Sequence, residues 1–129
     1  MLQQRHFTIE EAEAVLPKVE ILMKDVSVLR GKIESIIDSW QEKDSEEPAA
    51  TALAQGRVDF IATQINRRLD SIQQLGCVPK DTELGLVDFP ARLNGKEGFY
   101  CWKRGEGRIE YWHGLTEGYA GRIPIRQPA

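Results

Sequence analysis

The chain has 129 residues, of which 41% are hydrophobic, so its length fits one domain with a small core over residues 1–129. Its 17 basic and 20 acidic residues give a net charge of −3, which argues against nucleic acid or an anionic membrane as a partner. No apolar run approaches the ~20 residues that span a bilayer. The N-terminus has no signal-peptide pattern and two cysteines cannot form a disulfide scaffold, so we expect a cytoplasmic protein with reduced thiols.

The N-terminal part of the chain predicts a long helix. Thr8 and Glu11 have the spacing of a capping box, and Phe7 precedes it in the position that packs against Ala12 or its neighbours. Pro17 lacks an N–H, so it should kink this helix or end a short first helix at residue 16. Apolar residues recur at heptad spacing in two rows, which are Val15, Leu22, Leu29 and Ile36, and Ala12, Val19, Val26, Ile33 and Trp40.

A second helix is predicted from about residue 49 to residue 75, with one apolar face and with Gly76 in the position of a C′ glycine. The charged residues 41–47 predict an exposed connector, so residues 8–75 should form an antiparallel helical hairpin. The heptad seam covers about 39 Å at roughly 1.5 Å per residue, which is longer than a short strand can cover. We therefore expect the helices to pack on a further copy of the chain.

From residue 76 the apolar period changes to two, which is typical of strands. Residues 86–93, 98–103 and 108–113 predict three strands, and residues 114–129 predict a loop or tail. Asn94-Gly95 matches a type I′ turn, and Gly105-Glu106 is the expected second turn. The fold class is therefore α+β: a long antiparallel helical hairpin packed on a small three-stranded antiparallel β-meander, with the meander and C-terminal loop in residues 76–129.

The two turns fix a register for this sheet. The first hairpin places Arg92 opposite Glu97, a favourable pair of charges, and the second places Phe99 opposite Trp112. The face expected to lie on the helices carries Val87, Phe89, Tyr100, Trp102, Ile109 and Tyr111, with His113 at its rim. The other face carries the rows Pro90–Phe99–Trp112 and Asp88–Cys101–Glu110.

The second row suggests chemistry. Asp88, Cys101 and Glu110 could bind a divalent cation, or Cys101 could be a nucleophile beside a carboxylate. Flanking carboxylates raise the pKa of a thiol and disfavour the reactive thiolate, so a solvated face balanced by basic residues is the favoured interpretation. His113 could be a general base or a ligand, but at a strand end beside aromatic residues it is more often a structural histidine. His6, before the helix cap, is expected to be exposed.

The row of Phe99 and Trp112 could stack on single-stranded bases, but the acidic composition argues against this use. We expect residues 114–128 or a second subunit to cover the row, because an apolar patch of this size seldom stays bare. Arg122 lies in the segment GYAGR, which does not match a phosphate-binding loop, although its side chain could contact an anion.

Four segments carry a family resemblance: FTIEEAEAVLPKVE at 7–20, LGCVPKD at 75–81, ELGLVDFPARLNG at 83–95 and CWKRGEGRIEYWHGLTEGYAGRIPI at 101–125. Through them the chain resembles, essentially end to end, an uncharacterised group of small bacterial proteins, the family called domain of unknown function 2203. The resemblance implies a helical hairpin with a small sheet in a soluble bacterial protein, and it carries no established activity. The polar residues of these segments that we would mutate first are Asp81, Glu83, Asp88, Arg92, Glu106, His113, Glu117 and Arg122.

Two functional hypotheses follow. The favoured one is a non-enzymatic binding or assembly protein that self-associates through its helices, as a homodimer or higher oligomer, with no cofactor, bound metal or catalytic residue assigned. The alternative is a small enzyme or metal-binding protein that uses Asp88, Glu110 and His113, although the predicted register points His113 away from the two carboxylates. We expect any ligand at the sheet edge where residues 114–122 fold back, an anionic small molecule or acidic peptide. The ligand-binding candidates are Asp88, Arg92, His113 and Arg122.

Overall fold

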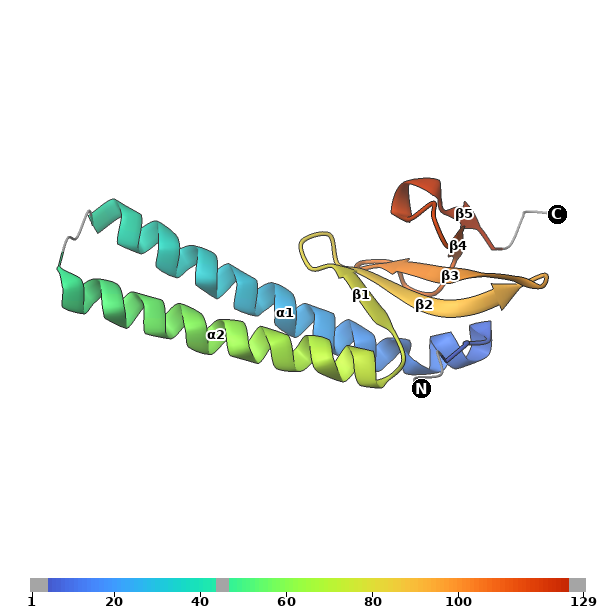
Figure 1. Ribbon diagram of the computed structural model, residues 1–129, viewed down its shortest axis with the longest axis horizontal. Coiled ribbons are helices and arrows are strands. Elements are labelled where there is room, and N and C mark those ends of the chain that lie inside the picture. The colour runs from blue at the N-terminus through green and yellow to red at the C-terminus, as the bar shows by residue number, and fades with distance from the viewer. Residues whose placement is uncertain (1–4, 44–46, 126–129) are drawn as a thin grey trace.

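The computed structural model describes residues 5–43 and 47–125. Two helices, α1 (Ile9–Lys43) and α2 (Pro48–Gln74), form an antiparallel hairpin. The chain then forms a small sheet that lies on one end of this hairpin, while the other end projects away from it (Figure 1). The α+β class is therefore confirmed.

The first turn of α1 has the predicted cap. The backbone N–H of Glu11 donates to the Thr8 hydroxyl at 3.1 Å, and the Thr8 N–H donates to the Glu11 carboxylate at 3.0 Å. Phe7 is buried against this turn, and its ring meets that of Phe89 edge to face at 5.4 Å. The helix does not end at Leu16, because α1 continues through Pro17. Buried apolar residues flank the proline, and their packing offsets the one lost helical hydrogen bond.

The hairpin connector is shorter than predicted. Helix α1 extends to Lys43, so residues 41–43 of the predicted connector are helical, and residues 44–46 lie outside the described residues. Helix α2 begins with Pro48 at its first turn and ends at Gln74. Gly76 has φ +96°, a left-handed conformation that suits a glycine after a helix C-terminus, as predicted.

The sheet has five strands rather than three, in the order β1-β2-β3-β4-β5 with every neighbouring pair antiparallel. The predicted strands are β2 (Leu86–Leu93), β3 (Lys96–Lys103) and β4 (Tyr111–Gly114). The additional strands are β1 (Val78–Asp81) and β5 (Ile123–Pro124). A short 3-10 helix, η1 (Tyr119–Gly121), lies between β4 and β5 in the chain. Both additional strands contain a proline, which weakened the strand signal. Both lie at an edge of the sheet, where a missing N–H is tolerated.

The register of the first hairpin is confirmed residue by residue, from Leu93 opposite Lys96 to Val87 opposite Trp102. Asn94 and Gly95 have φ +54° and +79°, the two left-handed residues of a type I′ turn. The second hairpin differs from the prediction by one residue, since Tyr100 pairs with Trp112 rather than with Tyr111. A seven-residue connector, residues 104–110, replaces the expected tight turn.

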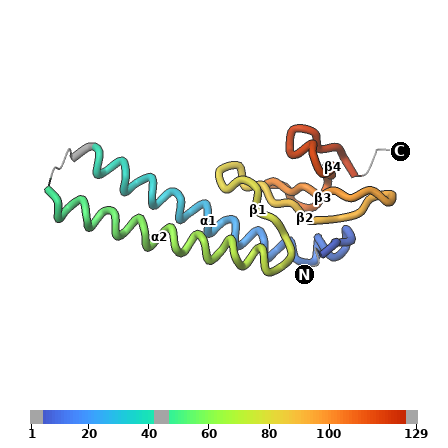
Figure 2. Tube along the Cα trace, viewed as in Figure 1, coloured from blue at the N-terminus to red at the C-terminus, as the bar shows by residue number. Residues whose placement is uncertain are grey.

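One face of the sheet, here called the core face, packs on the part of the hairpin formed by the N-terminal half of α1 and the C-terminal end of α2. The N-terminal part of α1 runs beneath this face, and the segment after β4 lies on the opposite side of the sheet (Figures 1 and 2). The core face carries Val87, Phe89, Ala91, Tyr100, Trp102 and Trp112. They pack with Leu16, Val19 and Met23 of α1, with Ile72 of α2 and with Ile109 of the connector.

The outer half of the hairpin has no core of its own. Between residues 27 and 71, no residue whose burial the structure describes is fully buried. Several large apolar side chains are exposed there, with Leu53 at 69% and Phe60 at 66%. Within the described ranges, neither helix is apolar enough over a sufficient length to cross a membrane.

Candidate metal-binding site

The shift of one residue in β4 decides which side chains share a face. Along a strand, successive side chains point to opposite faces, so a slip by one residue exchanges the two sets. Trp112, predicted on the exposed row, instead lies on the core face, and its ring meets that of Tyr100 at 6.1 Å. His113, predicted at the rim of the core face, points to the other face, here called the site face, with its ring 5.3 Å from that of Phe99.

Gly98 allows β4 to approach β3 in this register. A Cβ atom at this position would lie 2.5 Å from the carbonyl oxygen of His113 and 2.5 Å from the ring of Trp112. No side chain fits at that distance. Only a glycine at position 98 therefore allows β4 to approach β3 closely enough to place His113 and Trp112 where they are.

His113 is fixed by hydrogen bonds on both ring nitrogens. Nδ1 lies 2.8 Å from the carbonyl oxygen of Gly114, which can only accept, so Nδ1 carries a hydrogen. Nε2 lies 3.0 Å from Oδ1 of Asp88, and both side chains are only 4% exposed. A carboxylate oxygen and an imidazole nitrogen at this distance share a proton between them.

Cys101 completes a cluster of three different donor atoms. It pairs with Asp88 across β2 and β3, as predicted, and its side chain is buried. The thiol sulfur, a carboxylate oxygen of Asp88 and a ring nitrogen of His113 all lie within 4.8 Å of one another. Burial raises the pKa of the Cys101 thiol to about 11, and the negative charge of Asp88 adds to the rise while Arg122 opposes it. Without a further cation, this thiol is protonated at neutral pH.

This donor set has the chemistry of a site for a zinc-like ion. Thiolate, imidazole and carboxylate are the three ligand types that Zn²⁺ takes, and three protein ligands with an open position are typical of catalytic zinc sites. A metal-binding histidine commonly donates its other ring N–H to a backbone carbonyl, which is the role of Gly114 towards His113.

A cavity of about 210 Å³ lies on the cluster. Asp88, Cys101 and His113 form part of its wall, so a bound ion would be accessible from the cavity. The other residues that line it are Lys80, Leu86, Phe99, Leu115, Thr116, Gly118 and Tyr119. They come from β1, β2, β3 and the segment between β4 and β5, which closes over the site face.

Arg122 holds that segment in place. Its guanidinium donates to both carboxylate oxygens of Glu106, at 3.0 and 2.7 Å, and lies 3.9 Å from the ring centre of Tyr111 and 4.5 Å from that of Tyr119. Burial alone would lower the pKa of Arg122, but the hydrogen bonds and charge of Glu106 outweigh it and raise the pKa above its ordinary value. Glu106 also accepts from the backbone N–H of Lys103, at 2.8 Å.

The structure brings two of the four predicted ligand-binding residues together, Asp88 and His113. Arg122 reaches the neighbourhood of Cys101 but is already satisfied by Glu106. Arg92 pairs with the exposed Glu97 as predicted, outside the residues that line the cavity. A ligand-binding role for these two arginines stays a prediction.

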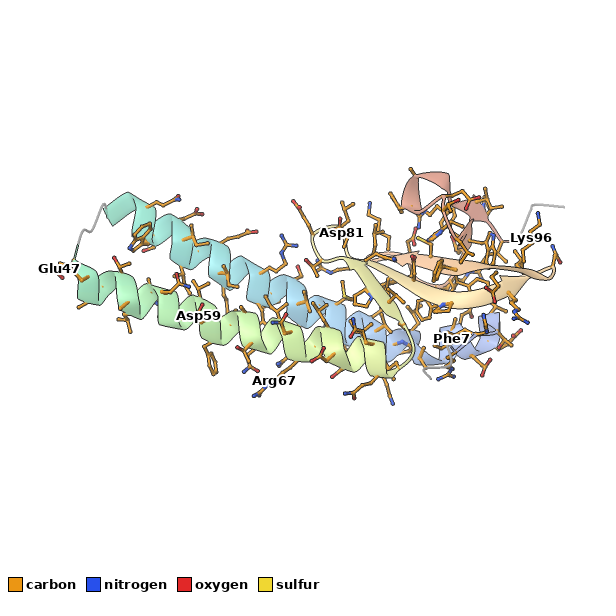
Figure 3. The ribbon with its side chains drawn as sticks, viewed as in Figure 1. Phe7, Glu47, Asp59, Arg67, Asp81 and Lys96 are labelled. Atoms are coloured by element: carbon orange, nitrogen blue, oxygen red, sulfur yellow. The ribbon has the colours of Figure 1, made fainter. Side chains whose placement is uncertain are left out.

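The trio of Asp88, Glu110 and His113 is not assembled. Glu110 is exposed, ahead of β4, and pairs with Arg108 at 3.2 Å. In the shifted register Tyr111, not Glu110, lies opposite Cys101, and His113, opposite Phe99, shares the face with Asp88 and Cys101. Asp81, another candidate for mutation, accepts hydrogen bonds from the backbone N–H groups of Glu83 and Leu84 and so stabilises the turn after β1. It lies at the end of the sheet opposite Lys96 (Figure 3).

Sequence reasoning missed Lys80 and Tyr119, because both lie in segments predicted as irregular. No simple alternation could have found Lys80, because the register of β1 and β2 is irregular between Pro79 and Asp81.

The fold and the cluster together define an α+β protein in which a helical hairpin supports a five-stranded antiparallel sheet. The site face of this sheet carries a Cys/His/Asp cluster. The chain belongs to the family of uncharacterised conserved proteins called domain of unknown function 2203, whose model matches residues 5–125. Comparison with curated proteins and with solved structures gives no match.

Proposed function

We propose that the protein binds a divalent transition-metal ion of the zinc class through Asp88, Cys101 and His113. The observation that carries this proposal is the buried convergence of three different donor types within 4.8 Å, with the histidine ring oriented by Gly114. Buried ionisable groups are costly unless they are paired or coordinate a metal, and Asp88 and His113, already paired with each other, are placed to coordinate one together with Cys101. An ion would take the place of the proton between Asp88 and His113 and would deprotonate the Cys101 thiol.

Three protein ligands would leave one position of a tetrahedral ion for a further ligand, and all three residues line the cavity. This arrangement supports the class of small enzymes or binding proteins in which a metal-bound water or ligand is the functional group.

The metal content of the purified protein tests the proposal. We expect one zinc ion per chain after equilibration with Zn²⁺ and removal of the excess, measured by mass spectrometry of the metal. Cys101→Ala should abolish this binding. Cys77→Ala is the matched control, because Cys77 is also a buried free thiol but lies in the hydrophobic core. Equal zinc content in the two variants would exclude the site.

We propose, as a second function, self-association through the outer half of the hairpin. The observation that favours it is that no residue of known burial between positions 27 and 71 is fully buried, together with the exposure of Leu53, Phe60, Val28 and Trp40. A second hairpin packed on this surface would complete a four-helix arrangement with a common core. Sedimentation equilibrium tests it: a mass of 14.6 kDa at high micromolar concentration would contradict self-association.

A further inference from the structure

We propose that the cavity on the site face binds a small aliphatic carboxylate, whose carboxylate group occupies the open position of the metal and pairs with Lys80. This inference rests on the proposed metal site and names the class of molecule that the site takes. It is carried by the charge, the wall chemistry and the size of the cavity.

The charge of the loaded site favours one negative charge. A divalent ion with the Cys101 thiolate and the Asp88 carboxylate is neutral overall, since His113 coordinates as a neutral imidazole. Asp88 is the only acidic residue among the described residues that line the cavity, and the metal neutralises it. Lys80 then contributes a positive charge to the same wall that no acidic residue among the described lining residues balances, with its ammonium group 5.9 Å from the ring centre of Phe99.

The walls of the cavity are mostly apolar beyond the metal ligands. Leu86 and Phe99 form one part, and Leu115 comes from the segment after β4. Leu115 is 63% exposed, so its side chain is available to cover an apolar group. A short hydrocarbon chain would bury against these side chains, whereas a phosphate or sulfate ion would gain nothing from them.

The size of the cavity limits the ligand. About 210 Å³ corresponds to roughly seven water molecules at the volume of liquid water. A carboxylic acid of a few carbon atoms fits this space, while a nucleotide or a folded partner does not. Tyr119 and Thr116 add hydroxyl groups to the wall, so a ligand with one further oxygen would also find a hydrogen-bond partner.

Cobalt spectroscopy of the full-length protein tests the inference. Co²⁺ bound through Cys101 gives a thiolate charge-transfer band and visible d–d bands, which report a change of the fourth ligand. We expect butyrate to change these bands in a saturable way and to bind on the order of tenfold more tightly than acetate, because each buried methylene strengthens binding by roughly fourfold. Lys80→Gln should weaken butyrate binding several-fold, and Lys96→Gln, at the hairpin turn remote from the cavity, should not.

The outcomes separate the two proposals. Cobalt binding with a thiolate band but no response to butyrate would overturn the carboxylate inference and leave the metal site intact. Phosphate binding as tightly as butyrate would also overturn it, because the apolar wall would then contribute nothing. Absence of the thiolate band in the wild-type protein would instead overturn the metal site on which the inference depends.

Discussion

His113 and Asp88 are each nearly inaccessible to solvent, and their side chains are joined by one hydrogen bond, while the second ring nitrogen of His113 pairs with the carbonyl of Gly114. A buried pair of this kind is costly to break, because removal of one partner leaves the other without compensation. The same pair is well suited to exchange its shared proton for a metal ion, since both lone-pair donors already point at one place. The chemistry of the site therefore depends on these two side chains more than on the arginines around them.

The second buried thiol gives a prediction that is independent of the metal. Burial raises the pKa of Cys77 to about 12 from an ordinary value of 9.0, and Arg5 opposes this only in part. The folded state therefore keeps the proton in a range of pH where the unfolded chain loses it. The stability that Cys77 contributes should be complete below pH 9 and should fall as the pH rises through about 12.

Denaturant unfolding of wild-type protein and of Cys77→Ala across this range measures the effect. The stability difference between the two should shrink towards alkaline pH, because alanine has no proton to lose. A difference that stays constant from neutral pH to pH 11 would contradict the raised pKa.

Trp102 provides a test of the core face. Its side chain is 1% exposed, and its indole N–H donates to the carbonyl of Glu106 at 2.9 Å. Trp102→Ala should lower the free energy of unfolding by about 3–5 kcal/mol, as for large aromatic residues in other cores. Trp40→Ala is the control, since Trp40 is 40% exposed on the outer hairpin and should cost less than about 1 kcal/mol in dilute protein. Equal melting temperatures for the two variants would exclude the packing described for β3.

Among the elements, β4 has the largest influence on the site, because it places Trp112 in the core and His113 beside Asp88 and Cys101. Its position depends on the close approach to Gly98. Gly98→Ala should push β4 away from β3, destabilise the protein and reduce its affinity for Zn²⁺ by at least tenfold. Titration of Zn²⁺ against a competing chelator measures this loss.

Gly107→Ala is the matched control for that variant. Gly107 lies in the connector before β4, and a Cβ atom there would meet no other atom within 4 Å. Its zinc affinity should equal that of the wild-type protein. If Gly98→Ala also binds zinc normally, then β4 does not depend on the contact with Gly98.

How far the sequence predicts these elements depends on the turn that joins them. Asn94-Gly95 allows one short hairpin, so the register of β2 and β3, and with it the pairing of Asp88 and Cys101, follows from the sequence. The connector before β4 contains two glycines, and several turn lengths fit it. Its actual conformation depends on the contacts of Glu106, which are a local one with the backbone N–H of Lys103 and a distant one with Arg122. The sequence therefore predicted two members of the cluster and misplaced the third.

At the scale of the whole molecule, the outer hairpin and the site face lie at different ends. We predict that Leu53→Glu combined with Phe60→Glu makes the protein monomeric, because both side chains are exposed apolar residues of α2 in the region without a core. Charged groups buried in a dimer interface would be costly to desolvate. Sedimentation velocity of the variant against wild-type protein measures the change.

Ile123→Glu is the control for this double variant. Ile123 is exposed to a similar degree, 55%, but lies on β5 at the edge of the sheet. It should sediment like the wild-type protein. Dissociation caused by Ile123→Glu, but not by the hairpin variant, would move the interface to the sheet.

Strand β4 contributes side chains to both the core face and the site face of the sheet, so binding at the site has a consequence for the stability of the fold. An ion that binds the folded chain and not the unfolded one stabilises it by RT ln(1 + [L]/Kd), which is about 2.7 kcal/mol at a free concentration one hundred times Kd. For a protein with so small a core, this increment is a large fraction of the total stability. The melting temperature should therefore rise with Zn²⁺ concentration and fall on addition of a chelator, and in the cell the lifetime of the folded chain would follow the supply of the metal.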